Sequence, residues 1–503
     1  MNDDHTDPLS YDDFDADNSS FAQFLRQLLG DEAADEAARA LRASGINPQD
    51  FAQHFPSPAH MEAAIGQFQY LMSTSTEPVN WKVATDLARQ QAYTAGDPLP
   101  SAAQAQRARQ ALTVADLWLD AVTDFMPGQV SRHVWSRTQW VDNTVDVWKR
   151  VCEPVAQNVT RSLSEAIRTQ FGDNDEAIEH LPEQARALFG HTQQMMPQLA
   201  SLMFASQVGQ ALSALAQESF GSTDVGLPLA GAGSAAVIVH NIEAFADGLD
   251  IPFEEVQQYI ALRECAHQRL FAAVPWLAGD LIRAVEKYST HIAIDMDAIS
   301  LAASQVDPSD PDSLEEALNG NIIFSAEPSP KQREALTRLE TLLALVEGWV
   351  EVVTTQAAMP YLPHADNLRE MMRRRRASGA PAEEILGSLI GLHMRPRRAR
   401  GAAEIFCLVE AEQGRQGRDA LWSHPHMIPT SEDLDSPSAF LVMRQAAQEQ
   451  DADIDDALAA LLDGTMGWAE GLMPDANTDP DASMRNEGPS MSDHDDEDDS
   501  TTN

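Results

Sequence analysis

One segment of this chain carries residue types at the spacing of a metal-dependent hydrolase. It reads Leu262-Arg263-Glu264-Cys265-Ala266-His267. In an H-E-x-x-H helix, two histidines four residues apart hold zinc, and the glutamate between them acts as the general base. Glu264 and His267 occupy the base and second-ligand positions, whereas Arg263 replaces the first histidine. A guanidinium stays protonated in proteins and cannot ligate a metal.

The residues leave two arrangements open for this segment. Arg263 can supply the positive charge that a metal would otherwise bring, by pairing with Glu347 or Glu264 through charge-assisted hydrogen bonds. Without such a replacement, carboxylates would be buried unpaired, which is costly. Alternatively, Glu347 and Glu351 share one helix face at i, i+4 and join Glu264 and His267 in a carboxylate-rich metal site.

Helices are expected to position these side chains, because apolar residues recur at helical spacing along most of the chain. We predict a signature helix over residues 253–273 and a second helix over about 330–358, which carries Glu347, Trp349 and Glu351. The glycine-rich stretch 221–240 ends in a β-branched run and predicts one short strand or hairpin. The predicted fold class is therefore mainly α, with at most a small β element.

Several blocks of the sequence resemble the bacterial zincin-like metallopeptidase family. Besides the segment around Glu264, they are Pro78–Trp81, Gln207–Leu212, Gly221–Leu229, Leu345–Val350 and Gly391–Arg398. The resemblance covers about residues 60–445. It implies a multi-helix zincin-like architecture, a zinc cofactor and a peptide or protein as substrate or partner.

The resemblance also implies roles for individual residues. Glu264 would be the general base, and His267 and Glu347 would be zinc ligands. Family members with an intact site carry E-G-H on the later helix, where this chain has Glu347-Gly348-Trp349, so Trp349 stands in the place of a histidine. Arg263, Trp349 and Glu351 would then support the site.

Two functions follow from this pattern. The first is a zinc-dependent metallopeptidase-like hydrolase with a degenerate metal site, in which a zinc-bound water activated by Glu264 attacks a peptide carbonyl. The second is a noncatalytic pseudo-metallopeptidase, a binding or scaffold protein in which Arg263 replaces the charge of the metal. The sequence does not predict an oligomeric state.

Composition divides the chain into four predicted parts. Residues 1–18 and 469–503 are dense in aspartate, and segments of that kind repel themselves and remain disordered. Between them we predict an N-terminal helical region over 19–220 and a zincin-like region over 221–468.

The charge balance disfavours several classes of partner. A formal net charge of −44 disfavours nucleic acid and anionic membranes, whose phosphates need Lys and Arg. The arginine run 373–376 lacks interleaved aromatic residues, and it is interpreted as a solvated helix end that complements the helix dipole and the protein's own carboxylates. Three widely separated cysteines and an acidic N-terminus predict a cytoplasmic protein.

Overall fold

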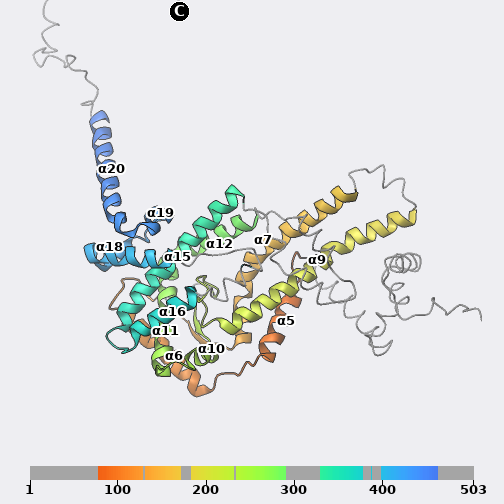
Figure 1. The fold of residues 1–503 in the computed structure, drawn as a ribbon, viewed down its shortest axis with the longest axis horizontal. Coiled ribbons are helices and arrows are strands. Elements are labelled where there is room, and N and C mark those ends of the chain that lie inside the picture. The colour runs from red at the N-terminus through yellow and green to blue at the C-terminus, as the bar shows by residue number, and fades with distance from the viewer. Residues whose placement is uncertain are drawn as a thin grey trace, which may run out of the picture. The chain divides into compact units, whose positions relative to one another are not determined.

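A computed structural model of the chain describes residues 77–127, 131–171, 183–230, 234–290, 329–377, 387 and 398–462. It confirms the predicted mainly α-helical class, with one small sheet (Figure 1). The segments predicted to be disordered, residues 1–18 and 469–503, lie outside the described residues. So does the Gly391–Arg397 part of the resembling block 391–398.

The described elements follow one another along the chain in a fixed order. They are α5 (Trp81–Thr94), α6 (Ala102–Leu119), β1 (Ser131–Val134), α7 (Arg137–Phe171), α9 (Glu183–Glu218), β2 (Ser234–Val237), α10 (Val239–Ala246), α11 (Phe253–Ala273), α12 (Pro275–Thr290), α15 (Pro330–Ala358), α16 (Ala365–Ala377), α18 (Arg398–Ala420), α19 (Ser431–Asp435), the 3-10 helix η2 (Pro437–Ala439) and α20 (Phe440–Leu462). The predicted signature helix 253–273 and the predicted helix 330–358 coincide with α11 and α15.

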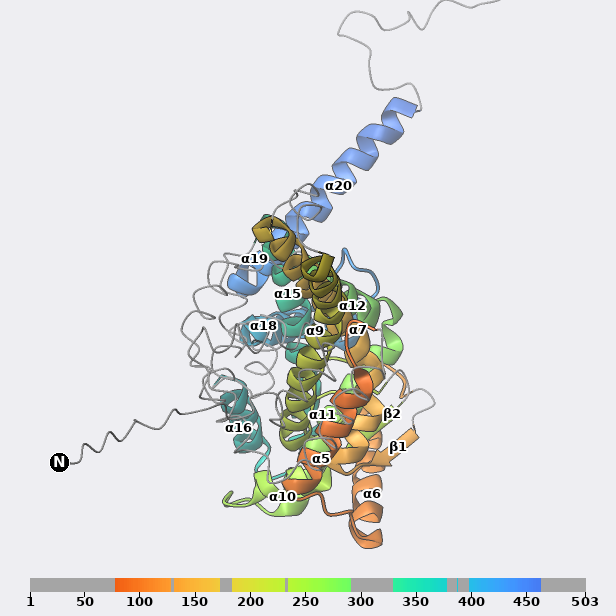
Figure 2. The same ribbon diagram turned by 90° about the vertical axis from the view of Figure 1, so that its right-hand side faces the viewer.

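Helix α11 lies at the centre of the packing. It contacts α6, α10, α12, α15, α16 and β2 (Figures 1 and 2). Nearly every residue from Val256 to Phe271 is buried. A helix enclosed on all sides is normally apolar throughout, so the charged residues Arg263, Glu264 and His267 on α11 require partners on the surrounding elements.

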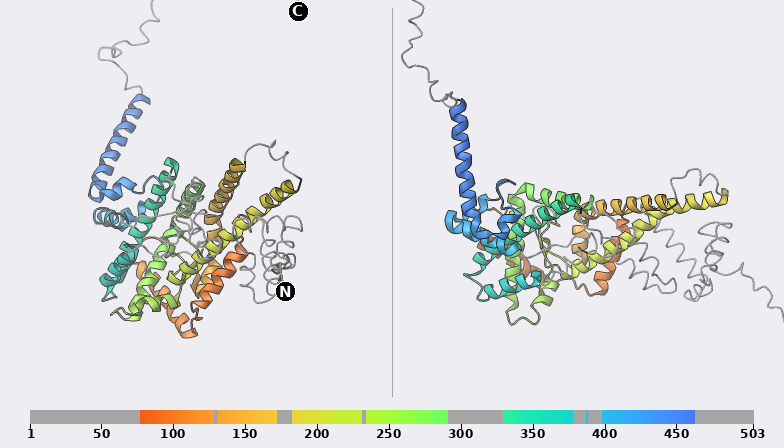
Figure 3. Two further views of the ribbon diagram at one scale, coloured as in Figure 1. Left: turned by 45° about the vertical axis from the view of Figure 1, so that its right-hand side comes forward. Right: turned by 45° about the horizontal axis from the view of Figure 1, so that its top comes forward.

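Within the part of the chain that the structure describes, the small sheet has two strands, β1 and β2, which pair in parallel with Ser131 opposite Ser234 and Val134 opposite Val237. The sequence predicted a strand or hairpin near 221–240, and β2 is that strand. Its strand partner is β1, which the sequence analysis did not identify, but β2 also forms an isolated antiparallel bridge between Val237 and Gly221, within the predicted stretch. Parallel strands need a long crossover, and here helices α7 and α9 provide it (Figure 3).

Helix α15 is fixed at its start and in its middle. Ser329 caps its first turn through a capping box with Gln332, and Pro330 occupies the first helical position. Further along, a Cβ added at Gly348 would lie 2.6 Å from the Cβ of Ala402 and from the backbone N of Ala403. Gly348 therefore allows α18 to pass close to α15, just beside Glu347.

The chain divides into two compact units, residues 1–440 and residues 441–503. The predicted boundary at residue 220 stays a prediction, although the β1–β2 pair and the contact of α6 with α11 join the segments on its two sides. None of the helices within the described ranges is both long and apolar enough to cross a membrane.

Candidate functional site

Arg263 points from α11 to α15, where its Nη2 donates a hydrogen bond to Oε1 of Glu347. Both residues are only 5% exposed. Burial alone would raise the pKa of Glu347, but Arg263 and Arg376 outweigh it and hold this pKa well below its ordinary value. Arg263 and Glu347 are therefore both charged at neutral pH, inside the protein.

A second arginine reaches the same carboxylate from the end of α16. The Nη2 of Arg376 lies 2.5 Å from Oε2 of Glu347. Arg376 belongs to the run 373–376, which the sequence analysis interpreted as a helix end and did not connect with the site. Two guanidinium groups from separate helices thus neutralise the residue that resemblance nominates as a zinc ligand.

The other arginines of the run also pair with carboxylates. Arg373 binds Glu351 through two of its nitrogens, and Arg374 pairs with the exposed Glu370 four residues earlier. Arg375 lies 3.2 Å from Asp224 and stacks over the ring of Phe220 at 4.0 Å. The arginines of the run thus pair with the protein's own carboxylates, as interpreted, but Arg375 and Arg376 are only 18% and 25% exposed, so this end of the helix is not solvated throughout.

His267 lies beside this cluster but is bound to its own helix. Its Nδ1 is 2.8 Å from the backbone O of Arg263, and because a carbonyl oxygen only accepts, Nδ1 must carry the hydrogen. Its Nε2 is buried, has no hydrogen-bond partner and lies 3.7 Å from Oε2 of Glu347. The two nominated ligands therefore do come together, with one unpaired nitrogen facing a carboxylate oxygen.

Glu264 is held by the glycine-rich loop and by strand β2. Its carboxylate accepts hydrogen bonds from the backbone N of Ser222, Thr223 and Ala236, each at 3.2 Å. It also accepts hydrogen bonds from the side-chain hydroxyls of Ser222 and Thr223, and Thr223 Oγ1 lies at 2.6 Å. A Cβ at Gly221 would lie 2.6 Å from Oε2 of Glu264, so only glycine lets the loop approach this closely.

Five donors therefore engage the oxygens of this carboxylate. Burial raises the pKa of Glu264 above its ordinary value, and the hydrogen bonds from Ser222 and Thr223 offset part of that shift. Sequence reasoning used this glycine-rich stretch to predict a strand or hairpin and as a mark of resemblance, but did not connect it with Glu264. Consecutive small polar residues after a glycine, which offer backbone N–H groups and hydroxyls together, are the signal that could have suggested an anion-holding loop.

Trp349 and Glu351 lie outside the cluster of Arg263, His267 and Glu347. Trp349 is fully buried, and its Nε1 donates to Oδ1 of Asp419 at 2.9 Å. Two residues along a helix correspond to about 200° of rotation, so Trp349 projects from the side of α15 opposite to Glu347. Glu351 faces Arg373. The carboxylate-rich alternative, with Glu264 and Glu351 beside His267, is therefore not the arrangement that the structure contains.

These donors do not fit a zinc ion. Zinc sites in proteins use at least three protein ligands. Here only His267 Nε2 and Glu347 Oε2 face each other, two guanidinium groups contact Glu347, and Glu264 is enclosed by its loop. Within the described ranges, no group of three or more His, Cys, Asp or Glu side chains is arranged to hold a metal ion.

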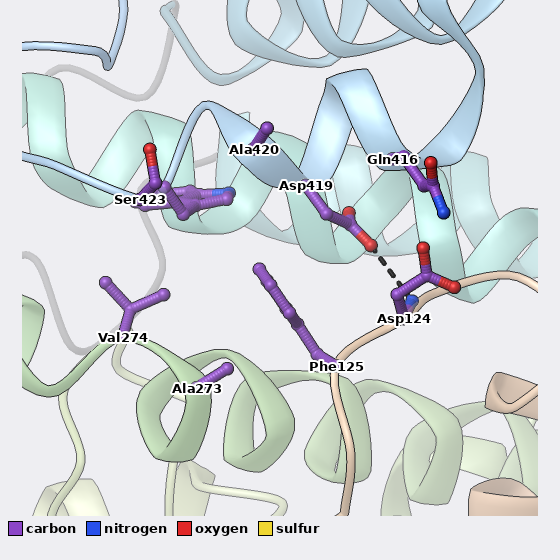
Figure 4. Close-up of a pocket in the computed structure, with 9 residues that line it drawn as sticks. Asp124, Phe125, Ala273, Val274, Gln416, Asp419, Ala420 and Ser423 are labelled. Atoms are coloured by element: carbon purple, nitrogen blue, oxygen red, sulfur yellow. Dashed lines mark hydrogen bonds between the residues drawn. The ribbon is translucent and has the colours of Figure 1, made fainter.

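A separate cavity of about 270 Å³ opens at the C-terminal end of α11 (Figure 4). Ala273, the last residue of α11, and the following Val274 line it, together with Phe125 and Asp419. Asp419 is fully engaged: Oδ1 accepts from Trp349 and Arg418, and Oδ2 accepts from Thr123 and from the backbone N of Asp124. None of Arg263, Glu264, His267 or Glu347 lines this cavity.

Comparisons with known proteins agree with this architecture. A family model described as zincin-like metallopeptidase matches residues 79–441. The crystal structure of a protein from Chloroflexus aurantiacus, provisionally described as a hydrolase with a novel fold, is similar with a TM-score of 0.51 and 17% sequence identity. The similarity covers 73% of this chain and 99% of that protein. At this identity it shows a shared fold alone. No curated protein sequence matches the chain.

Proposed function

The chain belongs to the zincin-like metallopeptidase family, and we propose that it is a noncatalytic member, in which arginines replace the metal and which acts by binding a protein or peptide. The surroundings of Glu347 carry this proposal. A zinc ion would bring two positive charges to that carboxylate, and the guanidinium groups of Arg263 and Arg376 bring the same number.

The position of Glu264 supports the same proposal. A general base must lie within hydrogen-bond reach of the proton that it removes. The oxygens of Glu264 are engaged by donors of residues 222, 223 and 236, in a buried position. Glu264 therefore acts as the anchor of the loop. A cytoplasmic location is part of the proposal, since all three cysteines are free thiols, as a reducing compartment requires.

One observation favours the alternative, a zinc-dependent hydrolase. His267 Nε2 is buried without a hydrogen-bond partner near Glu347, and such an orphaned atom is the kind that a metal would satisfy. Against it, a metal at this point would lie next to two guanidinium charges. We therefore rank metal binding second.

Metal content separates the two functions. The full chain, purified without chelator, is challenged with excess zinc, desalted and analysed by plasma mass spectrometry, beside the variants His267→Ala and Arg263→His/Arg376→Gln. We expect far less than one zinc per chain in the wild type and in His267→Ala. The double variant restores the first histidine, frees Glu347, and should retain zinc.

Stoichiometric zinc in the wild type that disappears in His267→Ala would refute the proposal. So would hydrolysis of a peptide library that chelator and Glu264→Gln both abolish. The first result would show that the metal site survives, and the second would establish the hydrolase.

A further inference from the structure

Helix α20 exposes a stripe of large apolar side chains. Ile454, Leu458 and Leu462 follow one another at intervals of four residues, and Met443 precedes Ile454 by about three turns, so all four lie toward one side of the helix. They are 56%, 50%, 78% and 66% exposed, respectively. Single exposed apolar residues are ordinary, but several aligned along one face of a helix mark an interaction surface.

Acidic residues flank this stripe. Asp453 lies on one flank and Asp455 on the other, and both are exposed. Apolar anchors at i, i+4 and i+8 are the pattern by which an amphipathic helix docks against a complementary helix or groove. The flanking carboxylates then require positive charges on the opposing surface.

The charges also decide between possible occupants. Two copies of α20 packed together would bring like charges into contact in a protein whose net charge is −44, and repulsion opposes that pairing. Anionic membranes and nucleic acids would be repelled in the same way. A lysine-rich or arginine-rich amphipathic helix of another protein satisfies the stripe and both flanks at once.

We propose that α20 is a docking helix, which binds a basic amphipathic helix of a partner protein through Met443, Ile454, Leu458 and Leu462. This surface is independent of the arginine cluster around Glu347. Failure of one proposal therefore leaves the other intact.

The test uses the full chain and a fluorescein-labelled amphipathic helical peptide of leucine and lysine as the probe, at about 0.15 M salt. Fluorescence anisotropy measures binding to the wild type and to Ile454→Gln/Leu458→Gln, which removes apolar surface and leaves the charge unchanged. Val442→Gln is the matched control, because Val442 is 70% exposed but lies about 120° around the helix from Ile454.

We expect the double substitution to weaken binding by about 100-fold, since buried aliphatic anchors each contribute about tenfold or more. Val442→Gln should change the affinity for the probe less than twofold. Circular dichroism should give the same helical content for all three proteins. Equal binding by the wild type and the double variant would overturn the proposal, because the probe would then be held by charge alone. Self-association, or binding to phosphatidylserine vesicles, that depends on Ile454 and Leu458 would also overturn it.

Discussion

The pairing of Arg263 with Glu347 makes a quantitative prediction about folding stability. Both side chains are almost fully buried. Removing one partner of a buried ion pair costs about 3–5 kcal/mol, because the other charge is left uncompensated. Arg376 still contacts the second oxygen of Glu347. We therefore expect the lower end of this range, about 3 kcal/mol, for Arg263→Met and for Glu347→Gln.

The double variant tests whether these two costs arise from one interaction. Arg263→Met/Glu347→Gln removes both charges together. Its loss of unfolding free energy should therefore be smaller than the sum of the losses in the two single variants. We expect a coupling energy of about 2 kcal/mol. Urea unfolding at neutral pH, followed by tryptophan fluorescence, measures it from the shifts of the midpoint at constant slope.

A control on α16 distinguishes this pair from ordinary surface charge. Arg374 pairs with Glu370, and 78% of the Arg374 side chain is exposed, so Arg374→Met should leave the midpoint unchanged within error. A coupling energy below about 0.5 kcal/mol between Arg263 and Glu347 would refute the reasoning. The charge of Arg263 would then not be what stabilises the buried carboxylate.

Three further predictions concern the same region. The side-chain NH₂ of Glu264→Gln would face hydrogen-bond donors, so we expect a loss of about 2 kcal/mol by urea unfolding; an unchanged midpoint would contradict the role of Glu264 as an anchor. Because the pKa of Glu347 is lowered in the folded state, its contribution is complete above its ordinary pKa of about 4.3 and is lost as pH falls toward the folded value. The stability difference between wild type and Glu347→Gln should therefore shrink from pH 6 to pH 3.5, and a constant difference would argue against the lowered pKa. Gly348→Ala should destabilise by about 1–3 kcal/mol, since its Cβ would lie 2.6 Å from that of Ala402; a thermal midpoint equal to that of the wild type would show that the helices can separate freely.

The sequence predicted the helices of the site better than their contacts. Helix α15 begins with a capping box and a proline, α11 has two acidic residues in its first turn, and the bounds of both helices agree with the prediction. Which face of α15 meets α11 depends on packing. Glu347 and Trp349 are two residues apart, and helix geometry separates them, but only the fold determines which of them meets His267.

The residues that complete the site were not predictable from local pattern. Arg376 lies 113 positions after Arg263, and Ser222 lies 42 positions before Glu264; only the tertiary fold brings these pairs to the site. Strand β1 was missed because it has four residues and alternates only between exposed and partly buried positions. A strand this short is defined by its pairing with β2, which comes about a hundred residues later.

The shared carboxylate of Glu347 also constrains how this protein can change over evolution. A histidine at position 263 alone would leave Arg376 on the carboxylate, and loss of Arg376 alone would leave Arg263 there. Evolution from a metal-binding centre to an arginine-filled centre, or the reverse, therefore needs at least two substitutions. The protein that carries only one of them is less stable than either end point. Such epistasis favours lineages in which positions 263 and 376 are exchanged together.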